Sequence, residues 1–169
     1  EDDVTKILDT VKLSRRMVVA KMAEVYDPLG VFEPFKLQLK LEVSKLNGME
    51  WDEILPDDLQ VQWEARLRQF TEIPDVLVNR CVIPVDAVNP ECIRLLCFSD
   101  AAEKAGGACI YAGYLRQNGE YSCQLLTAKS KLLDGLIPRN ELSGVSLMSE
   151  LAFLVSKALS KFRLEISYF

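Results

Sequence analysis

The fold is decided by residues 93–100, which have the sequence IRLLCFSD. The apolar run is typical of a strand buried in a sheet, and the strand ends in a polar Ser-Asp pair. Residues 108–115 form a second apolar strand, and Gln-Asn-Gly-Glu at 117–120 is typical of a tight hairpin turn. Residues 121–129 follow as a third strand. The sequence therefore predicts an antiparallel meander of three strands.

A long helix and a final strand follow this meander. Pro138 suits the first turn of a helix, and apolar residues continue at helical spacing to about residue 162. Residues 164–169 then alternate as a strand. The order β-β-β-α-β predicts a mixed sheet in which the helix is the crossover between strands.

The first part of the chain is predicted to be helical. Ser14 can cap a first helix, which has to end near Pro28 because the residue before a proline avoids helical geometry. Pro34 fits the first turn of a second helix. Asp57 or Asp58 can cap a third helix, whose apolar residues recur at helical spacing.

Composition restricts the possible functions. The 169 residues include 20 basic and 25 acidic side chains and no histidine, with a net charge of −5. A Ser-His-Asp triad and a histidine-ligated zinc site are therefore excluded. No apolar run is long enough for a membrane span. Residues 1–90 have 17 acidic and 11 basic side chains, whereas residues 91–169 have 8 and 9. This asymmetry favours two units, a helical connector at 1–75 and a sheet domain at 76–169.

The cysteines point to a reducing environment. Five are present, an odd number without a C-x-x-C pair, and several lie in apolar runs typical of strands. We therefore expect reduced, buried thiols rather than disulfides or a zinc site.

Two carboxylates are candidates for a site. Asp100 ends the first strand, although a turn-forming aspartate is the alternative. Glu141 lies in the first turn of the long helix, where the helix dipole alone favours an acid. The helical spacing nevertheless places Glu141 at the head of the apolar stripe that should pack on the sheet, formed by Val145, Met148, Ala152, Val155 and Leu159. A buried carboxylate needs a partner, and two carboxylates without histidine favour a hard cation such as Mg²⁺.

The same stretches resemble a known family. The sequence DAAEKA at 100–105, followed by Gly107-Ala108, is similar to the first carboxylate motif of the ribonuclease H domain in retrotransposon polyproteins. AKSK at 128–131 and IPRNEL at 137–142 resemble the segment with the second carboxylate. VYDPLG at 25–30, with the later Pro34 and Trp51-Asp52, is similar to the linker after a reverse transcriptase core. The order of these motifs resembles the BEL/Pao class of LTR retrotransposons.

The resemblance implies a fold and a chemistry. The fold would be α+β, of the α/β three-layer type, with an incomplete ribonuclease H-like sheet after the helical connector. Asp100 and Glu141 would be the first two carboxylates of a two-metal site that uses Mg²⁺ (or Mn²⁺) to hydrolyse the RNA strand of an RNA–DNA hybrid. Arg139 would contact a substrate phosphate, with a plain surface arginine as the alternative. Glu103 and Lys104 recur in the family motif without an assigned role.

The resemblance also implies partners and a location. The upstream reverse transcriptase domain of the same polyprotein is the expected partner besides the hybrid. The expected location is intracellular, in the cytoplasm, a virus-like particle or the nucleus.

The sequence departs from the family pattern after residues 164–169. The family's third carboxylate follows this strand, whereas the sequence stops at Phe169. We therefore expect a truncated fragment that binds Mg²⁺ weakly and has little nuclease activity by itself. A non-catalytic connection or scaffold module and a domesticated transposon remnant with an interaction role are the alternatives. Phe98, Tyr111 and Tyr114 suit base stacking, but the strand pattern favours core packing for them.

Overall fold

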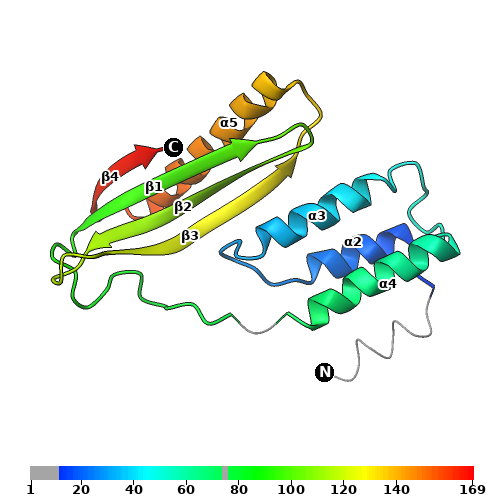
Figure 1. Cartoon of the computed structure of the whole chain (residues 1–169), viewed down its shortest axis with the longest axis horizontal. Coiled ribbons are helices and arrows are strands. Elements are labelled where there is room, and N and C mark those ends of the chain that lie inside the picture. The colour runs from blue at the N-terminus through cyan, green and yellow to red at the C-terminus, as the bar shows by residue number, and fades with distance from the viewer. Residues whose placement is uncertain (1–11, 74–75) are drawn as a thin grey trace. The chain divides into compact units, whose positions relative to one another are not determined.

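The computed structural model describes residues 12–73 and 76–169, which form four helices and a four-stranded sheet (Figure 1). The predicted α+β class is confirmed. The chain divides into two compact units, one containing the described residues up to Tyr26 together with Gln38–Leu77, the other containing Asp27–Leu37 together with Val78–Phe169. Residue 75, where we placed the domain boundary, lies outside the described residues.

The three helices predicted in the first part of the chain are confirmed. They are α2 (Arg15–Ala23), α3 (Glu33–Ser44) and α4 (Asp57–Thr71). The hydroxyl of Ser14 accepts a hydrogen bond from the Met17 N–H at 3.4 Å, so the predicted N-cap of α2 is also confirmed. The two aspartates at the start of α4 lie in its first turn rather than before it, where the helix dipole favours a negative charge.

The first unit has its own core. Gln60 is buried in it, and its side chain both accepts from the Leu13 N–H and donates to the Leu13 carbonyl, each at 2.9 Å. The buried polar group is thereby satisfied. The apolar side chains of this core are Leu13, Val18, Leu39, Leu46, Leu55, Trp63 and Leu67.

The second unit is built on the mixed sheet. Its strands are β1 (Cys92–Ala101), β2 (Ala105–Leu115), β3 (Tyr121–Leu132) and β4 (Arg163–Tyr168). They lie in the order β3-β2-β1-β4, with β4 parallel to β1 and the other neighbours antiparallel. Helix α5 (Ile137–Ala158) connects β3 to β4. The predicted order β-β-β-α-β is confirmed.

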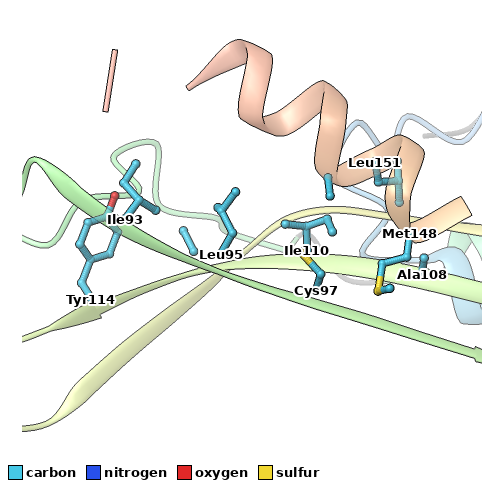
Figure 2. Packing of buried hydrophobic residues seen from close by; sticks show 10 residues of the cluster. Ile93, Leu95, Cys97, Ala108, Ile110, Tyr114, Met148 and Leu151 are labelled. Atoms are coloured by element: carbon cyan, nitrogen blue, oxygen red, sulfur yellow. The ribbon is translucent and has the colours of Figure 1, made fainter. Parts of the chain in front are cut away.

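Helix α5 packs on one face of this sheet. Figure 2 shows Leu95 and Cys97 of β1 and Ile110 of β2 in the same layer as Met148 and Leu151 of α5. All five side chains are buried. Because side chains alternate along a strand, the even-numbered residues of β1, including Asp100, belong to the opposite face.

The aromatic residues divide between the two faces. Tyr114 is buried in the core, as predicted. Phe98 is 38% exposed on the opposite face, so the prediction of core packing is wrong for it. The Phe98 ring stacks on Phe169 with the ring centroids 4.9 Å apart, and Tyr111 meets it edge-on at 6.1 Å. The cause is its even position in β1, which points away from α5.

All five cysteines are free thiols, and they differ widely in exposure. Only Cys97 is fully buried, whereas Cys81 and Cys123 are exposed, so the prediction of burial is wrong for these two. Burial, with a smaller contribution from Cys109, raises the pKa of the Cys97 thiol. Because the thiolate is the reactive form, we expect iodoacetamide at pH 8 to modify the two exposed thiols at least about tenfold faster than Cys97. Peptide mass spectrometry measures the rates, and equal rates would contradict the buried position of Cys97.

Candidate active site

Asp100 lies near the C-terminal end of β1. Its side chain is exposed, and its Oδ1 accepts a hydrogen bond from the Ala101 N–H at 2.9 Å. Across the sheet it pairs with Gly107 of β2. The turn between the two strands is closed by a bond from the Ala102 N–H to the Ala105 carbonyl at 2.7 Å. The strand end thus presents a carboxylate to solvent next to a tight turn.

Glu141 is the fifth residue of α5, one position after the predicted first turn, and its side chain is exposed. The prediction that it heads the buried stripe is therefore wrong, and Val145 is also 45% exposed. The buried positions of α5 are Asn140, Gly144, Met148, Leu151 and Ala152. They define a face turned slightly away from the predicted stripe, because Gly144 packs against the end of β1. A Cβ atom on Gly144 would lie 3.5 Å from both the Asp100 carbonyl oxygen and the Ala101 side chain.

Asn140 is the site residue that sequence reasoning missed. Its side chain is 2% exposed, and its Nδ2 donates to the carbonyls of Ala102, Glu103 and Gly135 at 3.0, 2.8 and 3.1 Å. Its Oδ1 accepts from the Gly135 N–H at 3.2 Å. A polar residue at a buried helical position was the available signal, since such a group needs partners. The amide joins the turn after Asp100 to the start of α5.

The remaining predicted residues are exposed around this junction. Arg139 lies in the first turn of α5, and Glu103 and Lys104 lie in the turn between β1 and β2. The structure thus brings Asp100 and Glu141 to the ends of two elements that contact each other through Gly144 and Asn140.

A hollow of about 590 Å³ lies beside Asp100. One wall is formed by Glu33, Pro34 and Leu37, and the base is formed by small residues of β1 and β2. Phe98 and Phe169 also line it. Of the predicted site residues, Asp100 lines the hollow and Glu141 does not. The carboxylate of Asp100 therefore borders a largely apolar recess.

The carboxylates of Asp100 and Glu141 are of the chemical type that a hard cation prefers, but they are too few to form a complete site. Carboxylate oxygens are the ligands that Mg²⁺ prefers. Within residues 12–73 and 76–169, however, no cluster of three or more histidine, cysteine, aspartate or glutamate side chains is placed to hold a metal ion. Asp100 and Glu141 are therefore at most part of a ligand shell.

In the described parts of the chain, no helix combines the length and the apolar character needed to cross a bilayer.

Comparison with known proteins identifies the family. The family described as "Pao retrotransposon-like RNaseH-like domain" matches residues 14–169. The chain belongs to this family, as the sequence motifs predicted. None of the curated proteins matches the chain.

Two solved structures are similar to the chain. The first is a foamy viral protease-reverse transcriptase in complex with double-stranded DNA, with 11% identity, a TM-score of 0.48, and coverage of 99% of this chain and 28% of that one. The second is another foamy viral protease-reverse transcriptase with double-stranded DNA, with 13% identity, a TM-score of 0.40, and coverage of 89% and 32%. The chain spans about a third of the length of these proteins.

Proposed function

We propose that the second unit supplies Asp100 and Glu141 as the first two acidic residues of a retrotransposon ribonuclease H site, which hydrolyses the RNA strand of an RNA–DNA hybrid. The observation that carries this proposal is the junction of β1 with α5. Gly144 packs against the backbone of Asp100, and Asn140 bonds to the turn that follows it. Both carboxylates are exposed at this junction, where a nucleic acid strand has access to them.

The proposed cofactor is Mg²⁺ or Mn²⁺, held in part by Asp100 and Glu141. When bound in a two-metal site, such ions activate a water molecule and stabilise the leaving oxygen. Arg139 is exposed next to Glu141 and supplies a positive charge for a phosphate of the hybrid. Because the described residues place fewer than three acidic ligands together, affinity for the cation should be weak in this polypeptide.

A metal titration tests this proposal. We expect Mn²⁺ to broaden the backbone amide NMR signals around residues 100–104 and 139–143 at one common midpoint concentration, because the two carboxylates share the ion. Asp100→Asn and Glu141→Gln should each abolish the common broadening, whereas Glu150→Gln, an exposed acid further along α5, should leave it unchanged. Broadening that is absent from the wild type, or that survives both substitutions, would refute the shared site.

Activity is tested in a polyprotein that contains this sequence. There, Asp100→Asn or Glu141→Gln should lower the rate of hybrid cleavage by more than about 100-fold, because removal of a metal ligand has a larger effect than removal of a group that only orients a ligand. For residues 1–169 alone, we expect little cleavage.

A scaffold that binds hybrid without cleaving it is the second candidate. The small number of acidic ligands in the described part of the chain favours it. Hybrid binding by a scaffold would not respond to Mg²⁺ or to Asp100→Asn and Glu141→Gln. Cleavage by the containing polyprotein that survives both substitutions, together with unchanged binding, would favour this candidate over the proposed function.

A further inference from the structure

The amide of Asn140 makes bonds that go beyond the needs of its own helix. Helix α5 begins at Ile137, and its N-cap position, Leu136, makes no side-chain capping bond. An asparagine that served only to start the helix would accept from a helical N–H group. Asn140 instead donates to the carbonyls of Ala102 and Glu103 in the turn between β1 and β2.

These bonds connect the two proposed ligands. Asp100 is two residues before Ala102, and Glu141 directly follows Asn140 in the chain. A single buried side chain thus links the backbone beside one carboxylate to the backbone beside the other. The bonds from its Nδ2 to Ala102 and Glu103 are 3.0 and 2.8 Å long, and the side chain is shielded from competing water.

We infer that Asn140 is a positioning residue that fixes the relative placement of Asp100 and Glu141 for a divalent cation. This inference rests on the proposed function. Groups that orient metal ligands from the outer shell typically change metal affinity by about 10-fold to 100-fold when they are removed. Without the amide, the turn after Asp100 and the first turn of α5 are no longer joined by these bonds, so the cation has to order both ligands itself.

The test uses residues 1–169 and Mn²⁺ as the probe, with the NMR titration described above, at a temperature well below the melting temperature of every variant. In Asn140→Ala we expect the midpoints for residues 100–104 and 139–143 to rise at least about tenfold and to separate from each other. Ser143→Ala is the control, because the Ser143 hydroxyl donates within α5 to the Arg139 carbonyl. This control should keep the common midpoint.

A second variant displaces the amide without removing it. A Cβ atom on Gly135 would lie 2.8 Å from Asn140 Oδ1, so Gly135→Ala pushes the side chain out of its present bonds. We expect the same rise in midpoint, and this variant carries the test if Asn140→Ala does not fold.

The possible outcomes separate the inference from the proposed function. A lower melting temperature with an unchanged common midpoint would mean that Asn140 is only structural, which overturns the inference and leaves the proposed function standing. A wild type without a common midpoint would overturn the proposed function, and the inference with it.

Discussion

Replacement of Gly30 by alanine is expected to destabilise the second unit by at least about 3 kcal/mol, from backbone strain and a steric clash together. The φ angle of Gly30 is +76°, a left-handed conformation that alanine rarely adopts. A Cβ atom at this position would also lie far inside the van der Waals contact distance of the Ala128 carbonyl oxygen on β3. Because that oxygen belongs to the backbone of a strand, it cannot move aside cheaply.

The clash matters because residues 27–37 cover the edge of β3. The Leu29 carbonyl accepts a hydrogen bond from the Ala128 N–H at 2.8 Å. Two residues further along β3, Glu33 Oε2 accepts from the N–H and the hydroxyl of Ser130 at 2.9 and 2.5 Å. Relief of the clash in Gly30→Ala would break these bonds and expose a strand edge, so we also expect the variant to self-associate.

Gly119→Ala is a matched control for this experiment. Gly119 has a φ angle of +84°, but a Cβ atom there would meet nothing within 4 Å. The free energy of unfolding of Gly119→Ala should therefore fall only by the strain of the left-handed backbone, about 1–2 kcal/mol. Chemical unfolding followed by circular dichroism gives both free energies, and sedimentation gives the state of association. An equal loss in the two variants would show that Gly30 does not pack against β3.

The element order could be predicted from sequence because it depends on local periodicity. Apolar runs, turn residues and helix-starting prolines located every strand and helix of the second unit to within a few residues. The contact between Gly30 and Ala128 could not be predicted in this way, because it joins segments almost a hundred residues apart. The resemblance marked both segments as motifs, but nothing in their sequences states that one covers the edge of the other.

The candidate site shows a second limit of sequence reasoning. Asp100 was located correctly at a strand end, because strand ends depend on local signals. The rotation of α5 about its own axis was not predicted correctly. Consecutive helical residues differ by about 100°, and a wide apolar face is compatible with several rotations. Gly144 decides the orientation by allowing α5 to approach Asp100, and the buried head of the stripe is consequently Asn140 instead of Glu141.

Replacement of Lys36 by methionine is the second change with a large expected effect. The Lys36 ammonium lies 3.3 Å from Asp27 Oδ2 and 2.9 Å from Glu33 Oε1. The side chains of Asp27, Glu33 and Lys36 are only 3%, 11% and 18% exposed. Lys36→Met removes a positive charge that both poorly hydrated carboxylates share, and we expect the free energy of unfolding to fall by about 3 kcal/mol. Arg94→Met, which breaks a more exposed ion pair with Glu165 in the same unit, should cost much less.

The pH dependence distinguishes this charge effect from simple loss of packing. Burial by itself would lower the pKa of Lys36, but the hydrogen bonds and charges of Glu33 and Asp27 outweigh burial and raise it above the ordinary value of 10.5. A raised pKa in the folded state means that the stabilisation is complete below pH 10.5 and is lost as the pH rises through the folded pKa. The difference in unfolding free energy between wild type and Lys36→Met should therefore be constant near neutral pH and should shrink above pH 10.5. A difference that persists unchanged at high pH would mean that the lysine acts through its aliphatic chain rather than through its charge.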